Sequence, residues 1–187
     1  AVGEVRYELD NRYAAYFPKI RPFGWMLMRD YNSDGYEDIF TSGPQGYVVY
    51  KNISYTVSGR PEFTELPTLT YRNMLPSGSF IEYNSLSTPS IHLPGIYDID
   101  FDGDIDVLSF HIGGQHVQYH KNLSMENYGV PDSLEFKLMN ECWGLFREDL
   151  NTNSLYLMDT TPPCTVGNIP NAESPQVETP KSRVPTE

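Results

Sequence analysis

Short runs of apolar residues recur along the chain, and Gly, Pro, Asn or Asp residues separate one run from the next. Segments such as "YVVYKN" and "HVQYHKN" have the β-branched and aromatic content of strands, and "SGPQG" and "IGGQ" are typical of the turns between them. No long stretch has helical periodicity. The pattern therefore predicts an all-β fold with strands at about 25–29, 38–42, 46–52, 61–66, 94–98, 105–110, 115–122 and 133–139.

These strands belong to an internal repeat. "RDYNSDGYEDIFTSGPQGYVVYKNIS" and "YDIDFDGDIDVLSFHIGGQHVQYHKNLS" share an acidic loop of the form D-x-[DN]-x-D-G-x-x-D, a Gly turn and a strand ending in Lys-Asn-[IL]-Ser. Asp30 corresponds to Asp98 at an offset of 98 − 30 = 68, and Asn52 to Asn122 at 122 − 52 = 70. Four antiparallel strands per repeat are the content of one β-propeller blade.

The repeat sets the expected organisation of the chain. We expect a β-propeller segment over 1–161 with two complete four-stranded antiparallel blades and partial flanking blades. Residues 67–94 are expected to form an ordered surface loop, and the Pro-rich tail a disordered segment. The expected parts are the end of a preceding blade at 1–20, the first repeat at 21–70, the second at 90–140, a partial following blade at 141–161 and the tail at 162–187.

Charge narrows the classes of function. The net charge of −12 argues against nucleic acid as a partner, because such binding depends on neutralising phosphates with Lys and Arg. No apolar run is long enough for a membrane span. The acids gather in the two loops, where like charges repel unless something positive lies among them. We expect solvent ions or a bound cation to supply that charge.

Each acidic loop has the composition of a calcium site. Calcium takes about six to eight oxygen ligands, and alternating acids in a tight turn can supply them. Gly35 and Gly103 permit a sharp turn with positive φ. Tyr36 and Asp104 are expected to offer their backbone carbonyls. The expected ligands of two structural sites are Asp30, Asn32, Asp34, Tyr36 and Asp38 in the first loop and Asp98, Asp100, Asp102, Asp104 and Asp106 in the second.

Several alternatives to calcium fit these loops less well. An EF-hand needs a bidentate Glu at position twelve, where this chain has Thr41 and Ser109 between strand-like segments. Magnesium prefers compact octahedral sites that keep several waters. A solvated acidic turn without metal is the simplest alternative, and the repetition of the loop argues against it. A catalytic carboxylate pair needs two groups whose pKa values are pushed apart, and these loops have no such pair in sequence.

Other polar and aromatic residues suggest structural roles. Cys142 and Cys164 form a disulfide or remain two buried thiols, and neither has a neighbour at zinc-ligand spacing. The strand-end Asn of each repeat is expected to have a structural role at the turn. His111, His116 and His120 are expected to make hydrogen bonds rather than bind a transition metal, and Trp25 and Trp143 to lie in the core.

At the acidic loops the chain resembles the FG-GAP/VCBS repeat family, whose β-propeller blades carry a D-x-D-G-D-G-x-x-D calcium loop between two strands. The likeness covers roughly residues 20–125 and includes "FGW" before the first loop. "CWGLFRE" followed by a later Cys is similar to a group of exported bacterial propeller proteins. The resemblance implies calcium ligands at the loop residues named above and a disulfide between Cys142 and Cys164.

Two blades cannot close a ring, so the chain is expected to be a fragment of a longer protein or an open unit that needs a partner. The resulting hypothesis is a non-enzymatic, calcium-binding scaffold or adhesion module of an exported or cell-surface protein. Its partner would be a protein or carbohydrate ligand at the cell surface. The alternative is the propeller part of a secreted polysaccharide-degrading lyase or hydrolase whose catalytic residues lie outside this chain.

Overall fold

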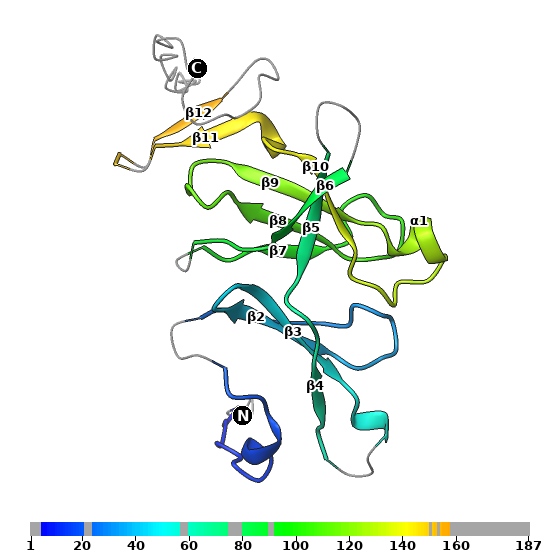
Figure 1. The fold of residues 1–187 in the computed structure, drawn as a ribbon. Coiled ribbons are helices and arrows are strands. Elements are labelled where there is room, and N and C mark those ends of the chain that lie inside the picture. The colour runs from blue at the N-terminus through cyan, green and yellow to red at the C-terminus, as the bar shows by residue number, and fades with distance from the viewer. Residues whose placement is uncertain are drawn as a thin grey trace, which may run out of the picture.

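The computed structural model describes residues 5–20, 24–56, 60–74, 80–89, 92–149, 151–152 and 154–157. Figure 1 shows two main β-sheets, one made by the blue and cyan part of the chain and the other by the green and yellow part. A small two-stranded sheet follows towards the C-terminus. The all-β fold is confirmed, and the sheets of the described residues do not close into a ring.

The first sheet has the strand order β1-β2-β3-β4, and every pair in it is antiparallel. Its strands match the four predicted for the first repeat closely, because their β-branched and aromatic content and the Gly turn are local signals of strand pairing. β2 and β3 are its buried strands, each with its first four residues inside the molecule. The strands are β1 (Met26–Arg29), β2 (Asp38–Gly43), β3 (Gly46–Asn52) and β4 (Phe63–Glu65).

The second sheet has six strands in the order β6-β5-β10-β9-β8-β7. Four of them form the predicted second antiparallel unit: β7 (Gly95–Tyr97), β8 (Asp106–Phe110), β9 (Val117–Asn122) and β10 (Phe136–Asn140). The other two, β5 (Thr70–Met74) and β6 (Phe80–Ser85), lie where a surface loop was predicted. That prediction was wrong, because β5 finds a parallel partner in β10, pairing Tyr71 with Phe136.

One hydrophobic core fills the space between the two main sheets. Its buried members come from both repeats and from the ends of the β5–β6 hairpin: Tyr31, Phe40, Tyr47, Val49, Leu69, Leu86, Ile96, Val107 and Phe136. Backbone hydrogen bonds join these ends to β3. The Tyr47 amide donates to Leu86 O at 2.7 Å, the Leu69 amide to Tyr47 O at 3.0 Å, and the Leu86 amide to Leu69 O at 2.8 Å.

The N-terminal flank differs from the strand content expected there. Residues 5–20 contain no strand among those described, only the 3₁₀ helix η1 (Ala14–Tyr16), so this segment supplies no strands of a preceding blade. Tyr7 is 94% exposed, because this strand-like sequence has no neighbouring strand on which to bury its apolar side chains. The segment instead contacts β4, where the Phe17 and Phe63 ring centroids are 5.3 Å apart.

Past β10, the chain forms the 3₁₀ helix η3 (Trp143–Leu145) and an antiparallel hairpin of β11 (Phe146–Glu148) and β12 (Leu155–Leu157). This hairpin agrees with strands predicted after the second repeat. The predicted disordered tail, 162–187, lies outside the described residues. Within the described part of the chain, no helix has the length and hydrophobicity needed to cross a membrane.

Candidate metal centre

Each acidic loop connects the first two strands of its repeat: residues 30–37 join β1 to β2, and residues 98–105 join β7 to β8. The two loops have the same backbone form. Gly35 has φ 86° and Gly103 has φ 103°, so the predicted positive φ is confirmed. Ser33 and Phe101, which also correspond, have φ 58° and 63°. The local sequence therefore produces the same turn twice.

The acid at position nine has the same role in both repeats. The Asp38 carboxylate accepts the Tyr31 amide at 3.2 Å and the Asn52 amide at 2.7 Å. The Asp106 carboxylate accepts the Ile99 amide at 3.0 Å and the Asn122 amide at 2.9 Å. Both acids are 0% exposed. Each one thus ties the start of its loop to the end of the third strand of its repeat.

The strand-end Asn side chains extend this network. Asn52 Nδ2 donates to Glu37 O at 3.1 Å, and Asn122, which is 0% exposed, donates from Nδ2 to Ser133 O at 3.0 Å. The Ser that follows each of these Asn residues also makes the same kind of hydrogen bond in both repeats. Ser54 Oγ accepts the Glu62 amide, and the Ser124 hydroxyl accepts the Ser133 amide, both at 3.0 Å. The structural role predicted for these Asn residues is confirmed.

In the first loop the acids bind backbone amides of the loop itself. Asp30 accepts the Asp34 and Gly35 amides at 3.1 and 2.8 Å, and Asp34 accepts the Tyr36 amide at 2.9 Å. Asn32 Nδ2 donates to Asp34 at 3.0 Å, while its buried Oδ1 has no hydrogen-bond partner among the described residues. The described acids of this loop do not converge on one point.

In the second loop the acids do converge. Carboxylate oxygens of Asp98, Asp100 and Asp106 lie within 4.8 Å of one another, and so do those of Asp100, Asp102 and Glu126. Sequence reasoning missed Glu126, which lies in the short helix α1 (Ser124–Tyr128) after β9. The only signal for Glu126 in the sequence is that an acidic residue follows shortly after the Lys-Asn-Leu-Ser segment at the end of β9.

Asp104 differs from its expected role. Position seven was expected to offer only a backbone carbonyl, so that its side chain was free to vary. The Asp104 side chain is instead 1% exposed, and its Oδ2 accepts the Met125 amide at 2.8 Å. Asp104 Oδ1 has no hydrogen-bond partner in the described part of the chain. Tyr36, at the same position of the first loop, is 39% exposed.

A lysine supplies positive charge inside the second cluster. Lys121 Nζ forms ion pairs with Asp100, with Asp102 Oδ2 at 3.0 Å and with Glu126 Oε1 at 2.5 Å. The expectation that only solvent or bound ions would offset these acids was therefore wrong. Lys51, at the corresponding position of the first repeat, pairs instead with Asp132 at 3.0 Å.

Burial makes the charged form of several acids costly. It raises the pKa of Asp38 and of Asp104 to about 6, against the stabilising backbone hydrogen bonds and with added repulsion from neighbouring acids. Burial likewise raises the pKa of Asp106. Burial by itself would raise the pKa of Asp102. The hydrogen bonds that its carboxylate accepts from Lys121 and from the Asp104 amide outweigh this effect, so the pKa is lowered. A cation beside the buried acids would favour their ionised forms.

The donor set fits a hard divalent cation. Every side-chain ligand offered by the two loops is oxygen, from carboxylates or from the Asn32 amide, which is the ligand type that calcium prefers. Buried oxygens without a hydrogen-bond partner in the described residues, Asp98 Oδ1 and Asp104 Oδ1, add acceptor capacity to the second loop. The residues present therefore suit calcium better than a metal that favours nitrogen or sulfur.

His111, His116 and His120 lie in or beside the hairpin of β8 and β9. His120 is 1% exposed, and its Nε2 lies 3.2 Å from Ser109 Oγ, as expected for a hydrogen-bonding histidine. His111 and His116 stack with ring centroids 4.8 Å apart. Groups of three metal-ligating side chains in the described residues include no histidine.

Of the two tryptophans, Trp25 packs edge-on against Tyr47 in the core with centroids 4.9 Å apart, as predicted. Trp143 lies in η3 and is 38% exposed, so its predicted core position is wrong. Its segment turns sharply at Gly144, with φ 78°, which prevents the strand that would have buried it.

Cys142 is buried, while Cys164 lies outside the described residues, and their pairing stays a prediction.

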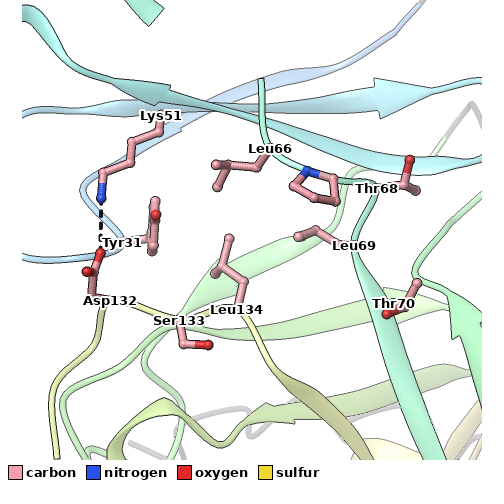
Figure 2. A pocket seen from close by; sticks show the side chains of 10 residues that line it. Tyr31, Lys51, Leu66, Thr68, Leu69, Thr70, Asp132, Ser133 and Leu134 are labelled. Atoms are coloured by element: carbon pink, nitrogen blue, oxygen red, sulfur yellow. Dashed lines mark hydrogen bonds and ion pairs between the residues drawn. The ribbon is translucent and has the colours of Figure 1, made fainter. Parts of the chain in front are cut away.

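A cavity of about 470 Å³ lies between the two sheets. Figure 2 shows Lys51 and Asp132 joined across one side of it, with Leu66, Leu69 and Leu134 along its inner part. The Lys51 ammonium also lies 5.6 Å from the Tyr31 ring centroid. The charged groups at this cavity are thus paired with each other.

No protein-family model matches the chain, and neither a curated protein nor a solved structure matches it. The likeness of its acidic loops to a propeller family therefore remains a resemblance of motifs.

Proposed function

We propose that this chain is a non-enzymatic, calcium-stabilised repeat module of the β-propeller type. It would serve as a scaffold or binding module of an exported or cell-surface protein, with a protein or carbohydrate partner. The observation that carries the proposal is the duplicated loop: the same positive-φ turn and the same buried ninth acid in both repeats.

A structural role for calcium follows from where the loops lie. Each loop joins the first two strands of its unit, and its ninth acid also bonds to the end of the third strand. An ion held by the loop would therefore connect three strands. It would also offset the cost of keeping Asp38, Asp104 and Asp106 ionised while buried.

The non-enzymatic assignment rests on what the acids already do. The carboxylates of both loops accept backbone amides or pair with Lys121, and these contacts hold the turns in place. Carboxylates that hold a turn together in this way are suited to binding a structural ion. The two antiparallel units would be consecutive blades, with β1 and β7 as edge strands.

Thermal melting in calcium and in excess chelator tests the proposal. Extracellular calcium sites of this kind bind at about 10⁻⁴–10⁻³ M, so calcium at about 1 mM should add roughly 0.4–1.4 kcal/mol per site. We expect Tm to rise by several degrees, with a much smaller rise in magnesium. Native mass spectrometry should count two bound calcium ions. An unchanged Tm and no bound ion would refute the calcium assignment.

Loop variants provide the matched control. The double variant Asp30→Asn, Asp34→Asn should lose one of the two ions, and Asp98→Asn, Asp100→Asn should lose the other. Glu37→Gln changes an exposed acid of the first loop that is not an expected ligand, so it should keep both ions. Equal loss of calcium in all three variants would indicate general charge attraction and not two defined sites.

A further inference from the structure

Lys121 lies at the centre of the acids around the second loop. Its ammonium group contacts Asp100, Asp102 and Glu126, and its side chain is only 16% exposed. These are the same three acids whose carboxylate oxygens lie within 4.8 Å of one another. The ammonium group therefore takes a place among oxygens that are arranged as they would be around a metal ion.

The first repeat provides an internal comparison. Lys51 corresponds to Lys121 at an offset of 121 − 51 = 70, yet its ammonium pairs with Asp132. No ion pair joins Lys51 to the first loop within the described residues. By the same offset, Thr56 is the residue of the first repeat that corresponds to Glu126, since 126 − 70 = 56. Thr56 Oγ1 donates to Ile53 O at 2.7 Å and offers no carboxylate to a lysine.

One ammonium group does not satisfy the whole cluster. Asp100 belongs both to the set around Lys121 and to the set formed with Asp98 and Asp106. Asp104, which is 1% exposed, keeps its Oδ1 without a donor in the described residues. The cluster therefore retains capacity for a second cation that has to share Asp100.

We propose that Lys121 is a tethered competitor of calcium in the second loop. In the metal-free chain its ammonium group holds Asp100 and Asp102, and calcium has to take these carboxylates from it. The inference rests on the calcium binding proposed above. Because a divalent ion and an ammonium group repel each other at such short range, Lys121 weakens calcium binding while it keeps the empty loop folded.

Calcium titration of the second loop alone tests the competition. The full chain with Asp30→Asn and Asp34→Asn serves as the parent, so that calorimetry reports only the second loop. Adding Lys121→Met should lower Kd for calcium about tenfold, because it removes the repulsion and keeps the length of the side chain. Lys121→Arg keeps the charge and should bind calcium like the parent. Lys51→Met, the matched control, should leave Kd unchanged.

Thermal melting gives an independent readout. In chelator, Lys121→Met should melt below its parent, since the acids lose their internal counter-charge. In saturating calcium the difference should shrink or vanish. A variant that is unfolded in chelator and folded in calcium supports the proposal, whereas one that is unfolded in both shows Lys121 to be a purely structural residue and overturns it.

The outcomes separate this inference from the proposed function. If the parent and every variant fail to bind calcium, calcium binding by the second loop is wrong, and the competition falls with it. If the parent binds calcium and Lys121→Met binds it no more tightly, the competition is wrong while calcium binding stands. Equal tightening by the Met and Arg variants would also contradict a charge effect.

Discussion

Asp106 accepts hydrogen bonds from three donors, one in the acidic loop and two in β9. Its carboxylate binds the Ile99 amide in the loop, the Asn122 amide at the end of β9 and the Tyr119 hydroxyl at 3.1 Å. A buried donor left without an acceptor costs about 1–3 kcal/mol. The residue therefore stabilises the second unit whether or not an ion is bound.

Asp106→Ala should lower the free energy of unfolding by roughly 3 kcal/mol even in excess chelator, because it leaves these donors unpaired. Denaturant titration measures the effect. Asp34→Ala is the matched control, since Asp34 is an exposed acid of the first loop. It should cost little in chelator and reveal its role only when calcium is added. An Asp106→Ala chain as stable as the parent in chelator would contradict this structural role.

His120 predicts an acid-sensitive contribution to stability. Burial lowers the pKa of its imidazole from 6.5 to about 4, and its Nδ1 has no hydrogen-bond partner among the described residues. Between these values the unfolded chain binds a proton that the folded chain does not. Stability is therefore complete above about pH 6.5 and is lost as the pH falls towards 4, by about 3 kcal/mol in total.

Denaturant titrations of the parent and of His120→Gln isolate this effect. Glutamine does not titrate, so the difference in unfolding free energy between the two chains should shift by about 2 kcal/mol between pH 7.5 and 5. Saturating calcium in every sample keeps the loop acids ionised. A difference that does not depend on pH would show that the folded chain protonates His120 without cost.

At the level of elements, the two acidic hairpins depend on glycines in a left-handed conformation. A Cβ added at Gly35 would meet no atom within 4 Å, and one at Gly103 would meet only Met125 Cε at 3.8 Å. The cost of Ala at either position is therefore conformational, about 1 kcal/mol or somewhat more. Gly95, in β7, does not have a positive φ and has room for a Cβ at ordinary contact distance from Leu108.

We expect Gly35→Ala and Gly103→Ala each to lower Tm by a few degrees and to weaken calcium binding by the altered loop. Gly95→Ala should leave both nearly unchanged. Melting curves and calcium titration check this together. Equal effects of all three substitutions would show that the turn conformation is not what positions the loop.

The strands of the two repeats could be predicted from sequence to within a few residues. Alternation, β-branched content and Gly turns are local signals, and each hairpin brings its own partner with it. β5 and β6 could not be predicted in the same way, because β5 gains its place by pairing with a strand 136 − 71 = 65 residues away. The opposite failure occurs at the N-terminal flank, where the end of a preceding blade was predicted and the described residues 5–20 pair with no strand.

The candidate site divides in a similar way. The loop residues and their positive-φ glycines could be read from the repeat. Lys121 and Glu126 could not, because Lys-Asn-[IL]-Ser recurs in both repeats and gives no sign that one lysine turns into its loop. Two of the acids that contact Lys121 lack a counterpart in the first repeat: Asp100 corresponds to Asn32 within the loop, and Glu126 corresponds to Thr56 outside it. The position outside the loop matters only once α1 folds beside it.

At the level of the whole molecule, the two sheets share one core and should unfold together. Leu86 is 0% exposed within that core, and its backbone carbonyl accepts the Tyr47 amide of the first sheet. Leu86→Ala should lower the free energy of unfolding by about 2–5 kcal/mol. Hydrogen exchange should show equal loss of protection in both sheets.

Leu155→Ala is the control for this prediction, since Leu155 in β12 is 64% exposed and should change the free energy of unfolding by less than about 0.5 kcal/mol. Loss of protection confined to the second sheet in Leu86→Ala would show that the two units are separate folding domains.

The parallel pairing of β5 with β10 also sets an order in time. During synthesis the first unit is complete once β4 has emerged, but the β5–β6 hairpin has to wait for β10, the last strand of the second unit, before it gains its neighbour. Long-range pairing of this kind is slow. We therefore expect pulse-labelled hydrogen exchange to find the amides of β5 protected late, in step with β10 and after β2 and β3. A nascent chain would carry an exposed strand edge until its second repeat has folded.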